Sequence, residues 1–126
     1  MTPTRAPRSV DPRSFLPLTP LAFQVLLAIS DHPRHGYGII REVEERTDDL
    51  IKLRTGTLYT LLQRLLDEGL IEESADRPHP DVDDERRRYY VVSTLGRSVM
   101  QSEARRLERV MGEVRRKHVL GRSSKA

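Results

Sequence analysis

The stretch from Arg54 to Leu70 reads RTGTLYTLLQRLLDEGL. Its leucines recur at intervals of three and four residues, which places them on one face of an α-helix. They are Leu58, Leu61, Leu62, Leu65 and Leu66. Gly69 is typical of the residue just past a helix end, because glycine adopts the left-handed conformation at low cost. The pattern predicts a helix with one face in a hydrophobic core.

The opposite face of this helix carries Tyr59 and Gln63 in one row, and Thr60 and Arg64 in the next. Arginine can pair with guanine O6 and N7, glutamine with adenine N6 and N7, and threonine with the thymine methyl group. Thr57 lies at or beside the expected helix start, where backbone N–H groups attract a phosphate. We therefore expect this face to enter the major groove of DNA. An ordinary amphipathic helix with a solvated polar face is the alternative.

Two further helices are expected upstream. The first, 20–31, follows a threonine cap, begins with proline and is apolar on nearly all sides. The second, 35–47, has one short apolar face. Gly36 and Gly38 weaken its first turn, which suggests a close backbone approach to another group. The alternation of apolar and basic residues at 51–54 predicts a very short strand before the third helix.

The C-terminal half of the chain predicts two strands and one long helix. LIEES (70–74) and RYYVVS (88–93) are rich in β-branched and aromatic residues, and the charged, proline-containing segment between them predicts an exposed hairpin loop. Because Tyr89 and Tyr90 alternate along the second strand, we expect one of them in the core. A helix over 94–120 has an apolar stripe made of Val99, Leu107, Val110, Met111 and Val114.

The order of these elements predicts a winged helix-turn-helix fold, mainly α with a small β-hairpin (α+β). The expected organisation is a disordered Arg/Pro-rich arm (1–17), a winged helix-turn-helix domain (18–93), a C-terminal dimerisation helix (94–120) and a frayed tail (121–126). The stripe of the last helix is too long for so small a domain to cover. A second copy of the chain is expected to bury it, with packing on its own domain as the alternative.

Composition narrows the possible functions. The chain has 126 residues, a formal net charge of +3, four histidines and no cysteine. The basic excess permits a nucleic-acid partner without requiring one. His32 and His35 have a possible metal-ligand spacing, but Pro33 interrupts the pair and no helix places two ligands on one face. No phosphate-binding glycine loop or nucleophile motif occurs, so we expect no enzyme activity, metal or cofactor. The apolar runs are too short to span a membrane and no signal peptide is recognisable, so we expect a cytoplasmic protein.

Residues outside the third helix extend the predicted DNA contact. Lys52 and Arg54 precede that helix and are candidates for phosphate contacts, with generic surface charge as the alternative. Tyr37 opens the second helix, and either rests on the DNA backbone or packs beneath the third helix. The second hairpin strand follows three arginines that suit phosphate or minor-groove contact: Arg86, Arg87 and Arg88. The DVDDE segment before them would be repelled by DNA, so a solvated charge run is the alternative.

Three segments resemble the PadR family of transcriptional regulators: LTPLAFQVLLAISDHPRHGYGIIREVEERT (18–47), GTLYTLLQRLLDEGLIEE (56–73) and DERRRYYVVSTLGR (84–97). The resemblance implies a homodimeric repressor that binds an inverted repeat, a palindromic operator in double-stranded DNA. It also implies that the first and last helices build the dimer interface, which adds Phe23 to the stripe residues. Relatives respond to phenolic acids, drugs or other stresses, so a small-molecule effector of unknown identity is a further expected partner.

A winged-helix module that binds another protein instead of DNA is the second interpretation. The acidic wing and the modest net charge favour it, whereas the Tyr/Thr/Gln/Arg face of the third helix favours DNA. Binding to DNA releases condensed counterions, so a steep salt dependence of binding to duplex DNA would separate the two interpretations.

Overall fold

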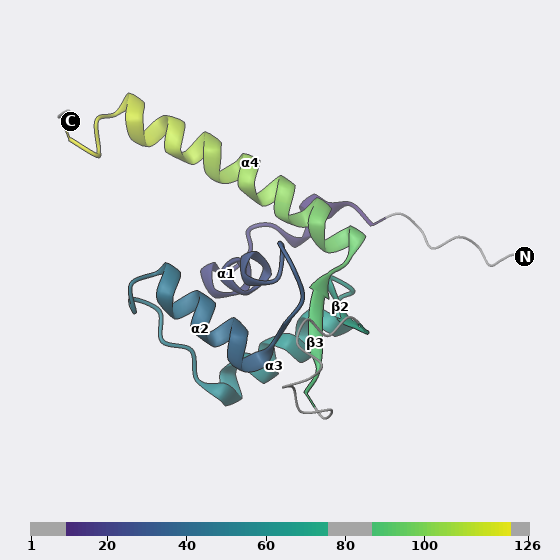
Figure 1. Cartoon of the computed structure of the whole chain (residues 1–126). Helices are drawn as coiled ribbons and strands as arrows, with labels where there is room; N and C mark the ends of the chain where they lie inside the picture. The colour runs from purple at the N-terminus through teal and green to yellow at the C-terminus, as the bar shows by residue number, and fades with distance from the viewer. Residues whose placement is uncertain (1–9, 76–86, 122–126) are drawn as a thin grey trace, which may run out of the picture.

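The computed structural model describes residues 10–75 and 87–121. Its elements in chain order are η1 (Pro12–Phe15, a 3₁₀ helix), α1 (Pro20–Ala28), β1 (Arg34–His35), α2 (Gly36–Arg46), α3 (Thr55–Asp67), β2 (Ile71–Ser74), β3 (Tyr89–Val92) and α4 (Thr94–Arg116). Helices α1 to α3 and the small sheet form one body, and α4 extends from it as a long rod (Figure 1). The predicted winged helix-turn-helix fold with a long C-terminal helix is confirmed.

Side chains just before three of the helices define where those helices begin. Thr19 Oγ1 accepts a hydrogen bond from the backbone N–H of Ala22 at 3.1 Å, at the start of α1. Ser93 Oγ accepts one from the N–H of Gly96 at 2.9 Å, at the start of α4. His35 fills this role for α2, where its Nδ1 accepts from the Gly38 N–H at 3.1 Å. Each contact satisfies a backbone donor that lacks an intrahelical partner.

The leucine face of α3 lies in the core, as the periodicity predicts. Leu58, Leu61, Leu62 and Leu65 are buried, and Leu66 packs against the same cluster. Gly69 ends the helix with a φ of 79°. The N–H of Gly69 and the N–H of the following residue donate to carbonyls of the last helical turn at 3.0 and 2.9 Å, which is the Schellman pattern of a helix end.

The sheet differs from the predicted two-stranded hairpin because it has a third strand. The strand order is β1-β3-β2, and all pairings are antiparallel. The strand expected at 51–54 is wrong: that segment is a loop, and the short third strand is β1. Two backbone N–H groups of this loop donate to side chains of α2 and of the residue that caps its C-terminus. The N–H of Leu53 donates to Glu44 Oε2 at 3.4 Å, and the N–H of Ile51 donates to Thr47 Oγ1 at 3.2 Å.

Strand β3 is the central strand of the sheet, and the burial of its two tyrosines differs from the expectation. Tyr89 and Tyr90 are both buried, whereas we expected only one of them in the core. Tyr90 belongs to the core cluster. The ring of Tyr89 packs edge-on against His35 of β1, with ring centroids 5.3 Å apart. The His35 ring thus covers Tyr89 while Tyr90 enters the core, so the alternation of exposure expected for a half-buried strand is lost.

The N-terminal arm is ordered further towards the N-terminus than the expected boundary at residue 17. Helix η1 packs against α4, and Phe15 and Leu16 contact the hydrophobic core. Buried Glu103 of α4 accepts a hydrogen bond from the backbone N–H of Leu18 at 3.2 Å. Arg106 donates to both carboxylate oxygens of Glu103, at 2.7 and 3.0 Å. The part of the predicted arm before Val10 lies outside the described residues.

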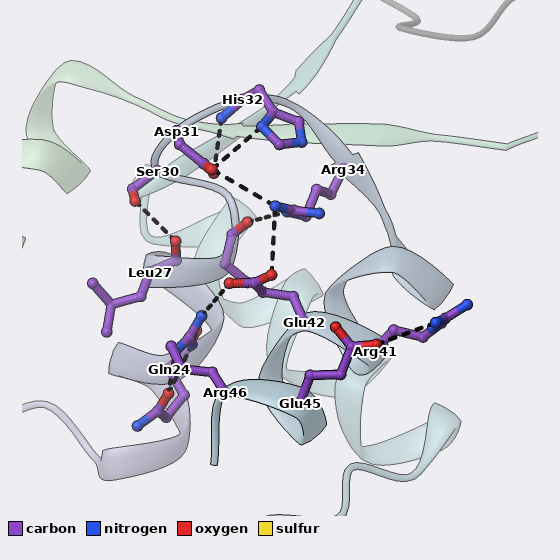
Figure 2. Close-up of polar contacts among 11 residues, drawn as sticks. Gln24, Leu27, Ser30, Asp31, His32, Arg34, Arg41, Glu42, Glu45 and Arg46 are labelled. Atoms are coloured by element: carbon purple, nitrogen blue, oxygen red, sulfur yellow. Dashed lines mark hydrogen bonds and ion pairs between the residues drawn. The ribbon is translucent and has the colours of Figure 1, made fainter. Parts of the chain in front are cut away.

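A polar network fixes α2 against α1 (Figure 2). Arg46 of α2 donates to the carbonyl oxygen of Gln24 at 2.8 Å and to its side-chain Oε1 at 2.7 Å. Glu42 lies between two arginines, 2.7 Å from Arg46 Nη1 and 3.5 Å from Arg34 Nη2. Arg34 also donates through Nε to the carbonyl of Ala28 at 2.6 Å, at the end of α1. These contacts hold the helix on which α3 packs.

The start of α4 is packed directly on the end of α3. Ser93 Oγ donates to the carbonyl of Gly69 at 2.6 Å, and the Ser93 N–H donates to the carbonyl of Leu70 at 3.0 Å. Gly96 is buried against the Leu70 carbonyl group. A Cβ atom at Gly96 would collide with the Leu70 carbonyl oxygen and would lie 2.9 Å from Val92 Cγ1. The direction in which α4 leaves the body therefore depends on a glycine at this position.

Candidate nucleic-acid interface

The polar residues of α3 lie together on its exposed face. Thr57, Tyr59, Thr60, Gln63 and Arg64 are all exposed, so the structure brings together the predicted recognition residues. Helix α3 begins at residue 55, before Thr57. Its cap is Arg54, whose side chain makes no capping hydrogen bond. Thr57 therefore belongs to the first turn and is not the cap.

Two carboxylates at the C-terminal end of α3 contact the recognition residues. Gln63 Nε2 donates to Asp67 Oδ1 at 2.9 Å, and Arg64 Nε lies 3.9 Å from Glu68 Oε1. Both pairs have the i, i+4 spacing at which side chains meet on a helix surface. The first turn of α3 has no acidic residue. The N-terminal half of the helix is therefore better suited to approach phosphates than the C-terminal half.

Tyr59 links the recognition helix to the start of α2. Its hydroxyl group lies directly over Gly36, where a Cβ atom would collide with the hydroxyl oxygen and would lie 2.8 Å from Tyr59 Cζ. The tyrosine is still 47% exposed, so part of the ring faces solvent. The close approach predicted at Gly36 is therefore an approach of α3 to α2. Gly38 has only ordinary contacts and makes no such approach.

Helix α3 is a ridge between two surface grooves. One groove, of about 530 Å³, lies between the start of α2, α3 and the start of β3, and its walls include Tyr37, Tyr59 and Gln63. The other, of about 540 Å³, lies on the opposite side of α3 and includes Thr60 and Arg64. A ridge of this kind fits the shape of a DNA major groove, which admits one helix and has a phosphate backbone on each side.

The other predicted DNA-contact residues surround this ridge. Tyr37 is 61% exposed, so it does not pack beneath α3. Its ring lies 5.9 Å from the guanidinium carbon of Arg41. Lys52 and Arg54 are exposed, and the Lys52 ammonium group lies 3.6 Å from Asp49 Oδ1. An exposed pair of this kind contributes about 1 kcal/mol or less, so it is easily exchanged for a phosphate.

The predicted wing arginines have contacts within the chain. Arg87 Nη1 lies 2.9 Å from His35 Nε2, and Arg88 Nη1 lies 3.3 Å from Glu73 Oε2. Arg86 lies outside the described residues. Burial raises the pKa of Tyr90, which lines the same groove; the neighbouring Tyr59 and Glu73 raise it further, and Arg88 opposes them. Tyr90 therefore keeps its proton at neutral pH.

A comparison with known protein families identifies the family of this chain. The transcriptional regulator PadR-like family matches residues 25–102. The chain belongs to this family. An uncharacterised protein from Lysinibacillus sphaericus is 32% identical over 77 residues, which are 60% of this chain and 67% of that protein.

Solved structures of PadR-like proteins have the same fold. A PadR-like transcriptional regulator from Bacillus cereus matches with a TM-score of 0.65 at 21% identity, over 82% of this chain and 93% of that one. Bacillus subtilis PadR, solved in complex with operator DNA, matches with a TM-score of 0.55 at 18% identity, over 65% of this chain and 45% of that one. At these identities the structural likeness establishes the fold alone.

Three features of this PadR-like interface were missed in the sequence. Asp67 and Glu68 contact two of the recognition residues, and the signal was present in the i, i+4 spacing of QRLLDE. Gly56 is the third: it lies exposed in the first turn of α3, and a Cβ atom there would meet nothing within 4 Å. Nothing in the free chain therefore requires glycine at this position.

The apolar stripe of α4 divides into two parts in this PadR-like chain. Val99 is fully buried in the core of its own chain, so it does not belong to a surface that a partner could cover. Leu107, Met111 and Val114 are half-buried, and Val110 is 45% exposed. The C-terminal half of α4 extends beyond α1 (Figure 1). Phe23 of α1 is also half-buried.

The described residues, 10–75 and 87–121, offer neither a metal site nor a membrane span. Among them, no cluster of three or more His, Asp, Glu or Cys side chains could hold a metal ion. No helix within these ranges is both long and apolar enough to cross a membrane.

Proposed function

We propose that this PadR-like regulator is a cytoplasmic repressor that binds a palindromic operator as a homodimer, with α3 in the major groove. The observation that carries the proposal is the exposed face of α3. Its Thr, Tyr, Gln and Arg side chains stand on a ridge between two grooves, and four buried leucines hold the helix from behind. Regulation through DNA binding requires no catalytic group.

The flanking residues would hold the protein on the phosphate backbone. Lys52 and Arg54 immediately precede α3, and Tyr37 lies in the first turn of α2; all three are exposed. Arg87 and Arg88 would exchange His35 and Glu73 for phosphates. Such contacts fix the register of the protein on the duplex but carry no sequence information. Arg86 adjoins these arginines in the sequence and would have the same role.

A homodimer would bury the exposed part of the α4 stripe. Val110 is 45% exposed, and Leu107, Met111 and Val114 are half-buried, so each has apolar surface left to cover. Full burial of an exposed side chain of this kind contributes about 1.5–3 kcal/mol, and these side chains would contribute part of that. Phe23 of α1 would complete the interface. One recognition helix reads only a few base pairs, whereas a two-fold symmetric dimer doubles the contacts on a palindrome.

A small-molecule effector would act by changing the distance between the two α3 helices. A ligand that binds between the α4 helices and the DNA-binding bodies with different affinities for two arrangements shifts the population towards one of them. Only one spacing fits two successive major grooves, so the shift would release the operator. Isothermal titration of drug-like and phenolic compounds, with DNA affinity measured in their presence, tests this step. If no compound changes the affinity for DNA, regulation by a ligand is left without support.

DNA binding itself is tested by titrating the protein into labelled DNA from upstream of its own gene, at several salt concentrations. An unrelated duplex and the variant Arg64→Ala are included. We expect selective binding, a negative slope of log affinity against log salt, and a loss of about 1–3 kcal/mol of discrimination in the variant. Equal, weak binding of both duplexes would contradict the proposal.

The protein-binding interpretation remains the alternative in that case. Two observations favour it: the carboxylates of Asp67 and Glu68 on α3, and the contacts of Arg87 and Arg88 within the chain. The salt series distinguishes the two functions, because the release of counterions is specific to nucleic acid.

A further inference from the structure

The contact between Gln63 and Asp67 restricts the orientation of the glutamine amide. Asp67 Oδ1 accepts a hydrogen bond from Gln63 Nε2 at 2.9 Å on the exposed face of α3. An aspartate carboxylate has hydrogen-bond acceptors only. The amide oxygen of Gln63 would be repelled by that carboxylate, so the NH₂ group must be the one that faces Asp67.

The contact with Asp67 therefore fixes which hydrogen-bonding groups the opposite edge of the Gln63 amide presents. One N–H of Gln63 is bound to Asp67, and the edge that remains carries the Oε1 acceptor beside the second N–H donor. Adenine offers the complementary pair in the major groove, the N6–H donor and the N7 acceptor. Guanine offers two acceptors, O6 and N7. The oxygen of a preset Gln63 would therefore face an acceptor on guanine.

We propose that Asp67 is a positioning residue that makes Gln63 select adenine over guanine in the operator. This inference rests on the proposed function, because it requires α3 to lie in the major groove. Without Asp67, the terminal torsion of the glutamine is broad and roughly two-fold, so the amide turns over easily. Its NH₂ group then reaches the acceptors of guanine, and the preference weakens.

The strength of this restraint depends on the surroundings of the pair. In water, a Gln–Asp pair at i, i+4 favours its hydrogen-bonded arrangement by only about twofold. A hydrogen bond with one charged partner is stronger where water is excluded, as it is between a helix and the groove that it fills. The effect should therefore be larger in the complex than in the free chain.

The neighbouring pair provides a matched control. Glu68 lies 3.9 Å from Arg64 Nε, one residue along the same helix end. A guanidinium group has donors only, so a carboxylate beside it cannot change which hydrogen-bonding groups it presents to a base. Glu68→Gln therefore removes the same charge from the same end of α3 without affecting the orientation of an amide.

The experiment begins with selection of the full-length protein on a library of randomised duplexes. The base position whose preference disappears in Gln63→Ala is assigned to Gln63, and we expect adenine there. The affinities of two duplexes that differ only by adenine or guanine at that position are then measured. For the unmodified protein we expect a preference for adenine of roughly five- to 150-fold, the range of one bidentate contact.

Three variants test the role of Asp67. Asn has almost the same shape as Asp but offers both a donor and an acceptor, so it supports either orientation of the amide. Asp67→Asn should lower the adenine preference by about threefold or more, the effect of a weak hydrogen bond. Asp67→Glu keeps an acceptor-only group and should retain the preference. Glu68→Gln should strengthen binding to both duplexes alike, because it removes a charge that repels phosphate, and should leave their ratio unchanged.

Four outcomes would overturn the inference. The first two are a fall of less than about threefold in the adenine preference of Asp67→Asn, and an equally large fall in the adenine preference of Glu68→Gln. The other two are loss of the adenine preference in Asp67→Glu, and a base position assigned to Gln63 that does not select adenine. Each is distinct from failure of the proposed function, in which the unmodified protein selects no sequence from the library and both proposals are wrong.

Discussion

Replacing Gly56 by alanine should make the protein more stable and its binding to DNA weaker. Gly56 is the second residue of α3, and a Cβ atom there meets nothing within 4 Å. A glycine within a helix costs roughly 0.5–1 kcal/mol relative to alanine. Since the structure offers open space, the substitution should recover most of that cost. In a chain of this size the melting temperature should rise by about 2–5 °C.

The same methyl group should interfere with DNA. Gly56 lies on the exposed side of α3 beside Thr57 and Thr60, on the face proposed to enter the major groove. If the α3 backbone passes close to the duplex there, the added methyl group acts like an overpacked contact, which costs about 1–3 kcal/mol. The corresponding loss of affinity is about five- to 150-fold. Melting curves measured by circular dichroism and fluorescence anisotropy with a selected duplex give the two quantities separately.

Gly112→Ala is the matched control, because Gly112 lies in α4 and a methyl group there would also meet nothing within 4 Å. It should raise the melting temperature by a similar amount and leave the affinity for DNA unchanged. The reasoning is refuted if Gly56→Ala binds DNA as tightly as the unmodified protein. It is also refuted if Gly56→Ala melts earlier, since the added methyl group would then meet a clash where the structure has open space.

Three further predictions concern α4. Gly96→Ala should destabilise the protein by about 1–3 kcal/mol or more, measured by urea unfolding, because the methyl group would collide with the Leu70 carbonyl. The hydrogen bond from Arg106 is the main cause that lowers the folded-state pKa of Glu103 below its ordinary value of 4.5. The carboxylate therefore stabilises the fold at pH values above that ordinary value, and this contribution is lost as the pH falls through the folded-state pKa. Glu103→Gln should therefore unfold more easily at pH 7, and differ less from the unmodified protein in acid; parallel unfolding curves at every pH would contradict this. If the proposed homodimer forms through α4, Met111→Asp should yield monomers in light scattering at concentrations at which the unmodified protein scatters as a dimer. A dimer that persists in the variant would exclude the C-terminal half of α4 as the interface.

The sequence by itself determined the elements that depend on near neighbours. The period of the leucines specifies α3 and its buried face, because side chains three and four residues apart share one side of a helix. Thr19 and Gly69 mark a helix start and a helix end through hydrogen bonds that span only a few residues. The order of helices and strands then led to the winged helix-turn-helix fold.

Only the tertiary structure decided which residues meet across long separations in the chain. The two residues of β1 are too few for a periodic pattern, and they are a strand only because β3 lies beside them. That pairing also brings the ring of His35 against Tyr89, while Tyr90 joins the core cluster. Val99 is taken into the core of its own chain, and Tyr59 lies over Gly36. Burial of this kind depends on partners that are distant in sequence, so no local pattern of residue types could specify it.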